Sequence, residues 1–191
     1  MNSLEIEHKI IKKAFQKIEL IGWENFNLQK FSKDEKISLE KINFFFPSKS
    51  HLLKKFSKMI DYNVESKISS DDMDFSSIKD NLFELIMLRF EQMEDYKKSL
   101  KIIIKTASSK PILLSQISKN IINTLDFYLE ISNGYDKSTL DFFKKNILFL
   151  IYSYCFNVWL KDSSSDLSKT MAELDRLLST AEKFSKKFKE F

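Results

Sequence analysis

The chain has 191 residues, 43% of them hydrophobic and 30% charged, which is enough for one or two domains with a substantial core. It holds only two glycines and two prolines, too few for the frequent turns of a β-sandwich or an α/β enzyme, so the composition predicts an all-α protein. The net charge of +4 lies within residues 1–62, which hold 12 lysines, no arginine and 8 acidic residues. Such an excess fits a segment that meets phosphates, and a solvated surface is the alternative explanation.

The apolar periodicity predicts helices over residues 6–21, 28–33, 38–45, 50–62, 78–94, 96–107, 112–131, 141–160 and 167–188. We expect Gly22 to end the first helix, Ser50 to cap the fourth, and the sequence Ser132-Asn133-Gly134 to cap the helix before it. Residues 69–77 have the composition of a loop and are the best candidate for a boundary between the N-terminal part and the body.

The stretch from Asn27 to Lys49 predicts two short helices joined by a tight turn, the outline of a helix-turn-helix. Ser38 is expected to cap the second helix, with Lys41 where a capping box has Glu. Helical spacing turns one face inward and leaves an outward face for the major groove, formed by Glu40, Lys41, Asn43 and Phe44.

The residue order in this stretch resembles the signature of the TetR (tetracycline-repressor) family, which runs roughly V-S-x-G-T-L-Y-x-Y-F-x-x-K-x-x-L. The matching positions are Ile37-Ser38, Ile42, Phe45-Phe46, Lys49 and Leu52, and upstream Ile10-Ile11, Ala14-Phe15 and Gly22-Trp23-Glu24 resemble the family's first helix and following loop. The resemblance implies a DNA-binding helix-turn-helix domain at residues 1–49 and a ligand-binding and dimerisation domain at residues 50–191. It places the DNA contacts at Asn27, Ser38, Leu39, Lys41, Asn43, Phe44 and Lys49.

The sequence departs from the family pattern at four positions of this motif. Lys36 and Glu40 replace glycines, Lys41 replaces Thr and Asn43 replaces Tyr. Lysine at a left-handed turn position costs roughly 1 kcal/mol relative to glycine. Lys41 and Asn43 can still donate hydrogen bonds to a phosphate, whereas Glu40 repels one.

The C-terminal pair of predicted helices forms an apolar seam that one chain would struggle to cover. We expect these helices to pair with a second copy in a four-helix interface, as the TetR resemblance implies, through Ile147, Ile151, Tyr154, Val158, Leu167, Met171, Leu174, Leu178 and Ala181.

The segment from Val158 to Leu178 also resembles the TetR-fold lipid-binding family of ubiquinone biosynthesis. Both relatives would hold a small apolar or lipid-like ligand in the helical body, where we expect a pocket from Phe83, Met87, Phe90, Met93, Ile103, Phe127, Tyr128, Ile151, Tyr152, Phe156 and Trp159. Arg89 and Asp126 are candidates for orienting a polar end of that ligand. Two readings stay open: a ligand-responsive transcriptional regulator, in which ligand shifts the helix at 50–62, and a lipid-binding accessory protein that does not bind DNA.

Catalysis, cofactors and metals find no motif in the sequence. Phosphate loops, paired histidines and Cys-x-x-Cys are absent, and the single Cys155 lies in an apolar stripe. No signal peptide is recognised at the N-terminus, and the longest apolar run, Ile147 to Leu160, is shorter than the roughly 20 residues that span a bilayer. We therefore expect a cytoplasmic protein without enzymatic activity or a transmembrane segment.

Overall fold

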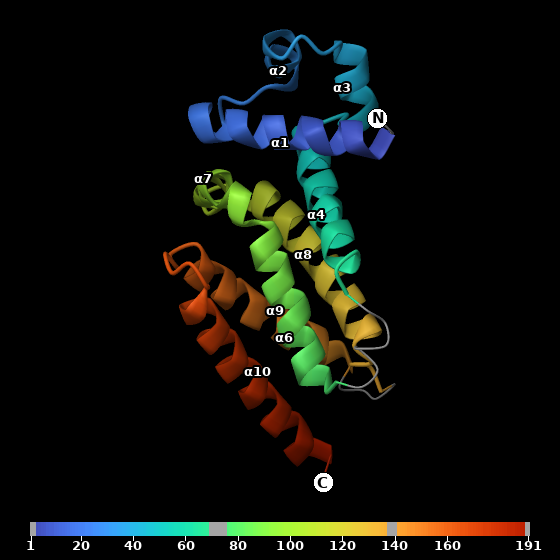
Figure 1. Ribbon diagram of the computed structural model, residues 1–191, viewed down its shortest axis with the longest axis vertical. Coiled ribbons are helices and arrows are strands. Elements are labelled where there is room, and N and C mark those ends of the chain that lie inside the picture. Colours follow the sequence, from blue (N-terminus) through green and yellow to red (C-terminus); the bar gives the residue numbers. More distant parts are fainter. Residues whose placement is uncertain (1–2, 69–75, 137–140, 190–191) are drawn as a thin grey trace. The chain divides into compact units, whose positions relative to one another are not determined.

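The computed structural model describes residues 3–68, 76–136 and 141–189, and this part of the chain is helical without a strand (Figure 1). The all-α prediction is therefore confirmed. The elements are α1 (Ser3–Ile21), α2 (Leu28–Asp34), α3 (Leu39–Phe45), α4 (Lys49–Glu65), α6 (Ile78–Gln92), the short 3₁₀ helix η1 (Glu94–Tyr96), α7 (Lys97–Ala107), α8 (Pro111–Ile131), α9 (Asp141–Trp159) and α10 (Ser168–Lys189). Most of the predicted loop at 69–77 lies outside the described residues.

The chain divides into two compact units. The first unit consists of Met1–Tyr62 and Met93–Asn120, and the second of Asn63–Gln92 and Ile121–Phe191. Helices α4 and α8 each begin in the first unit and end in the second. The functional domains at 1–49 and 50–191 stay a prediction.

The first unit is built on the apolar stripe of α1, whose buried members recur every three or four residues. Phe15 of this stripe stacks on Phe56 of α4 at 4.1 Å between ring centroids, and Tyr96 meets both rings edge-on. Figure 1 shows α2 and α3 on one side of α1 and α7, which packs against α1, on the other. These contacts fix the base on which the helix-turn-helix rests.

Two helix ends of the first unit test the predictions of caps. Gly22 ends α1 as expected: its φ is +81°, and its N–H donates to the carbonyl of Ile18 at 2.9 Å. Ser50 does not cap α4, because that helix begins earlier, at Lys49. Ser48 has the capping position instead, where its Oγ accepts the backbone N–H of His51 at 3.3 Å.

The second unit packs α10 against both α9 and α6. An aromatic cluster lies in its core, where Phe90 stacks on Tyr152 and on Trp159 at centroid distances of 5.3 and 5.6 Å. Arg89 is buried beside this cluster, and its Nε donates to the hydroxyl of Tyr152 at 3.2 Å. A buried charged group is thus held inside the unit by a polar partner.

Asp162 lies in the loop between α9 and α10. Its two carboxylate oxygens accept hydrogen bonds from the backbone N–H and the hydroxyl of Ser164 and of Thr170, at 2.5 to 3.0 Å. Burial alone would raise the pKa of Asp162, but these hydrogen bonds outweigh it and hold the pKa well below the ordinary value. The carboxylate therefore stabilises the start of α10 as an anion.

The predicted cap of α8 is confirmed, and Asn133 is the residue that takes the left-handed conformation, with φ +54°. The N–H groups of Asn133 and Gly134 donate to the carbonyls of Glu130 and Leu129, the pattern of a Schellman motif. A Cβ at Gly134 would crowd Leu129, because it would lie 2.8 Å from Cδ2 and 3.1 Å from the carbonyl oxygen of that residue.

Candidate functional site

The corner between α2 and α3 is formed by local hydrogen bonds. Asn27 caps α2, its Oδ1 accepting the backbone N–H of Gln29 at 2.8 Å and of Lys30 at 3.1 Å. At the other end, Lys36 has φ +54°, and the N–H groups of Lys36 and Ile37 donate to the carbonyls of Lys33 and Ser32. The turn is therefore a Schellman motif. Lys36 takes its left-handed position, at which the sequence predicted a cost for lysine relative to glycine.

Two serines fix the direction of α3. The hydroxyl of Ser32 donates to the carbonyl of Ile37 at 2.7 Å, which ties α2 to the end of the turn. Ser38 then caps α3, its Oγ accepting the backbone N–H of Lys41 at 3.3 Å, which confirms the cap predicted from sequence. The orientation of α3 thus follows from short contacts along the chain.

The outward face of α3 carries four exposed side chains that could contact nucleic acid. Ile42 and Phe45 are buried, whereas Glu40, Lys41, Asn43 and Phe44 are exposed, as helical spacing predicted. Phe44 is 77% exposed and touches only the edge of Phe45 among the aromatic rings around it. An aromatic side chain this exposed has no role in the core of the unit.

The α2–α3 corner carries more lysines than acidic residues. The two acidic residues of the turn are matched by α1, since Lys17 Nζ lies 2.7 Å from the carboxylate of Asp34 and Lys13 pairs with Glu35. The hydrogen bond from Lys17 also lowers the pKa of the Asp34 carboxyl. Four further lysines of the corner are exposed and form no ion pair with any residue the structure describes: Lys30, Lys33, Lys36 and Lys41. Their charge is available to phosphates.

Other predicted DNA contacts lie in mixed surroundings. Asn27 and Ser38 are exposed but already accept backbone hydrogen bonds as caps, and Leu39 is half-buried. Lys49 is turned toward the unit: its Nζ donates to the carbonyl of Trp23 and lies 4.5 Å from the centroid of the Trp23 ring. Burial, and secondly the charge of Lys110, lower the pKa of Lys49. The contact between Lys49 and Trp23 joins residues far apart in the sequence, so no local pattern could predict it.

A second exposed surface follows α9. Phe142, Phe143, Ile147, Leu150 and Tyr154 recur at helical spacing and are exposed, with Phe142 and Leu150 at 71% and 67%. An apolar stripe on one helix face is typical of a surface that another protein covers. Met171 and Phe184 of α10 are exposed apolar residues of the same unit.

The nine residues predicted for a dimer interface differ in how far the chain itself buries them. Ile147, Tyr154 and Met171 are exposed, Val158 and Ala181 are half-buried, and the chain itself buries Ile151, Leu167, Leu174 and Leu178. Sequence reasoning missed Phe142, Phe143 and Leu150, because α9 is apolar nearly all round and its periodicity does not show which side is covered.

The residues predicted for a ligand pocket are mostly core. Met93 and Ile103 belong to the first unit, and the other nine to the second. Phe83, Phe127 and Phe156 are half-buried, and the remaining residues are buried: Met87, Phe90, Met93, Ile103, Tyr128, Ile151, Tyr152 and Trp159. The pocket stays a prediction, and four of its aromatic members form the packed cluster beside Arg89: Phe90, Tyr152, Phe156 and Trp159.

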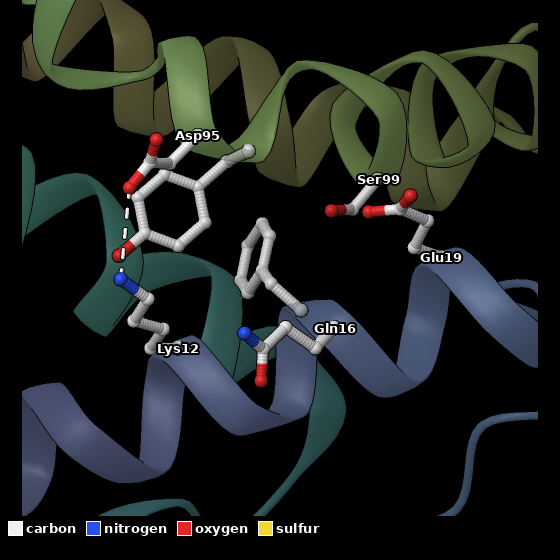
Figure 2. Close-up of a pocket in the computed structure, with 7 residues that line it drawn as sticks. Lys12, Gln16, Glu19, Asp95 and Ser99 are labelled. Atoms are coloured by element: carbon white, nitrogen blue, oxygen red, sulfur yellow. Dashed lines mark ion pairs between the residues drawn. The ribbon is translucent and has the colours of Figure 1, made fainter.

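A polar pocket of about 300 Å³ lies in the first unit between α1 and the η1–α7 segment (Figure 2). Its α1 side carries Lys12, Phe15, Gln16 and Glu19, and the facing side carries Asp95, Tyr96 and Ser99. Figure 2 shows the ion pair between Lys12 and Asp95, whose charged atoms are 3.6 Å apart. None of the predicted ligand residues lines this pocket, because its charged residues have the sequence signature of an ordinary helix surface.

The thiol of Cys155 is fully buried, and burial raises its pKa to about 11. It is therefore protonated near neutral pH and a poor nucleophile. Among the helices of the described ranges, none is long and apolar enough to cross a bilayer.

Known proteins resemble this chain in fold, whereas no similar sequence was found among family models and curated proteins. No family model and no curated protein matches the chain. Among solved structures, a TetR transcriptional regulator from Nitrosomonas europaea ATCC 19718 superposes with a TM-score of 0.76 at 18% identity, over 93% of this chain and 98% of that one.

Two further structures are similar at lower TM-scores. A TetR transcriptional regulator from Rhodococcus sp. RHA1 gives 0.57 at 15% identity, over 94% of this chain and 97% of that one. A putative TetR-family regulator from Mesorhizobium loti MAFF303099 gives 0.55 at 12% identity, over 94% and 96%. At these identities the likeness shows a shared fold, and it confirms the fold that the sequence motif implied.

Proposed function

We propose that this chain, which has the fold of the TetR family, is a transcriptional regulator that binds duplex DNA through α2 and α3. The observation that carries the proposal is the corner itself: a capped α2, a tight turn and a capped α3 with a polar outward face. This is the geometry in which a second helix enters the major groove while the first crosses the backbone. The proposed DNA-binding domain is residues 1–49, with residues 50–191 as the ligand and dimer part.

The charge distribution supports DNA as the partner. Four exposed lysines of α2, the turn and α3 lack ion pairs with described residues, so binding to phosphates would not have to break any: Lys30, Lys33, Lys36 and Lys41. Lysines that replace counterions on DNA supply affinity without sequence preference. They would set the register in which the exposed side chains of α3 meet base edges.

The proposed regulator is a homodimer that pairs through α9 and α10. The stripe of Phe143, Ile147, Leu150 and Tyr154 steps by four, three and four residues, which matches a helix-helix seam. A second copy would offer the same stripe, and a symmetric dimer matches each apolar patch to itself. It would also hold two helix-turn-helix corners on one DNA molecule.

A small apolar or lipid-like ligand is proposed to bind in the second unit near the aromatic cluster. Arg89 is a buried charged group beside this cluster, and its guanidinium would suit a ligand with an anionic end. Helices α4 and α8 run from this unit into the first one, so a change in their ends would be transmitted along the chain. Ligand would thereby bias the DNA-competent state.

The lipid-binding accessory protein is not the favoured alternative. Three solved structures that resemble this chain over more than nine-tenths of its length are named as transcriptional regulators. An intact turn, two formed caps and an exposed α3 are also unnecessary in a protein that does not bind DNA. We therefore keep the regulator as the proposal.

The test is a titration of the purified protein with DNA from upstream of its own gene across a salt series. For the regulator, log K falls linearly with log salt, and each lost phosphate contact reduces the slope by about 0.9. The double variant Lys33→Gln, Lys41→Gln is expected to reduce both slope and affinity, whereas Lys161→Gln, which removes an exposed lysine outside the helix-turn-helix, is expected to leave both unchanged. Absence of binding at low salt, or an equal effect of Lys161→Gln, contradicts the proposal.

A further inference from the structure

Glu40 and Phe44 form one line along the outward face of α3. They are four residues apart, which places them one turn apart on the same side of the helix. Both side chains are exposed, and Glu40 forms no ion pair with any residue the structure describes. The line therefore presents an acidic hydrogen-bond acceptor followed by an aromatic ring.

Neither side chain is suited to the DNA backbone. A carboxylate repels phosphates, and a phenyl ring offers them no hydrogen bond. Both fit base edges in the major groove, however. A carboxylate accepts a hydrogen bond from the N4 amino group of cytosine, and an apolar ring contacts the C5 methyl group of thymine. The residue pair that weakens backbone contacts is thus chemically matched to pyrimidines.

The spacing of the pair sets the spacing of the bases. Four residues of an α-helix rise about 6 Å, and neighbouring base pairs are about 3.4 Å apart. The two side chains therefore reach positions about two base-pair steps apart when α3 lies along the groove. Phe44, being 77% exposed, would exchange water for a methyl group without moving any core residue.

We propose that Glu40 and Phe44 are the specificity-determining residues of this protein, reading a cytosine and a thymine about two base-pair steps apart. This inference rests on the proposed DNA binding and adds the base chemistry of the site. Lys30, Lys33, Lys36 and Lys41 supply affinity for any duplex, and the Glu40–Phe44 line selects among sequences. A thymine is recognised by its methyl group, and a cytosine by its amino group.

The first stage of the test selects bound duplexes from a random library with the wild-type full-length protein at low salt. The selected site is then made with each thymine replaced in turn by uracil, which removes only the C5 methyl group. At one position the wild-type affinity is expected to fall about fourfold, the effect of losing one buried methyl group. This stage needs no variant, so it does not depend on how a substitution folds.

The second stage assigns the positions to residues. In Phe44→Ala the thymine and uracil duplexes are expected to bind equally, whereas in Leu20→Ala, which shortens an exposed apolar residue of α1, the fourfold difference is expected to persist. Glu40→Gln is expected to lose about tenfold of the preference for cytosine over thymine at the paired position. Circular dichroism confirms that each variant is folded.

The outcomes separate the two levels of the argument. If the wild-type protein binds no duplex at low salt, the proposed function fails and this inference falls with it. If it binds with a steep salt dependence but no uracil substitution changes affinity, the regulator stands and the assignment of Phe44 is overturned. If Glu40→Gln leaves base preference unchanged, the assignment of Glu40 is overturned.

Discussion

Lys36 is the residue at which a substitution should stabilise this protein. It adopts φ +54° at the left-handed position of the turn between α2 and α3. Turns of this kind usually have glycine, and sometimes asparagine, at this position. The left-handed conformation costs an L-residue about 1–2 kcal/mol. Glycine avoids that cost, although its greater freedom in the unfolded chain offsets about 0.5–1 kcal/mol of the gain. Lys36→Gly is therefore expected to raise the free energy of unfolding by about 0.5–1 kcal/mol.

Lys33→Gly is the matched control, because it makes the same substitution three residues earlier within α2. At a helical position glycine is expected to lower the free energy of unfolding by about 1 kcal/mol. Both lysines are exposed and form no ion pair with described residues, so the charge lost is the same. Only the backbone conformation distinguishes the two variants.

The assay is urea unfolding followed by the fluorescence of Trp23, which is buried in the first unit. A Trp159→Phe background removes the other tryptophan, which lies in the second unit, so the signal reports the unit that holds the turn. The midpoint is expected to rise in Lys36→Gly and to fall in Lys33→Gly at unchanged slope. If both variants are destabilised by similar amounts, the turn is not left-handed at Lys36 and the reasoning is refuted.

Three further predictions concern the second unit and the assembly. Asp162→Asn is expected to lose about 1–3 kcal/mol of stability at pH 7. Because the folded pKa of Asp162 is lowered, the wild type should lose this advantage as the pH falls below about 4. The difference in unfolding free energy between the two proteins should therefore shrink in acid, and a constant difference contradicts the assignment. Gly134→Ala is expected to lower the unfolding free energy by about 1–3 kcal/mol, because its Cβ would crowd the side chain and carbonyl of Leu129; an unchanged melting temperature argues against this packing. Leu150→Arg is expected to halve the mass measured by light scattering, whereas Leu20→Arg, at an even more exposed apolar residue of α1, should leave it unchanged; a monomeric wild type refutes the proposed dimer.

The sequence determined most features that depend on neighbours along the chain, although Ser48 and not Ser50 caps α4. Helices came from apolar periodicity, and their ends came from residues such as Gly22, Ser38 and Asn133, whose side chains or backbone act within four or five residues. The outward face of α3 followed from the same spacing. Even the strain at Lys36 was visible, because a turn of fixed length needs a left-handed residue at a fixed place.

Tertiary structure decided what depends on residues far apart in sequence. Lys49 is the clearest case: its position in the motif indicates a DNA contact, but Trp23, 26 residues away, offers a carbonyl and a ring that hold its ammonium group. The same holds for α9, where an apolar helix gives no sign of which side α6 and α10 cover, so Ile151 is buried and Leu150 is exposed.

The physical reason is the range of the interactions. Hydrogen bonds of caps and turns are made within one or two helical turns, so a local sequence specifies them. Burial is decided by which surfaces meet when helices pack, and apolar attraction is non-directional, so many pairings satisfy one stripe. The sequence alone therefore determined the helices, their ends and the outward face of α3, whereas the packed structure decided which apolar residues form the core and which remain for a partner.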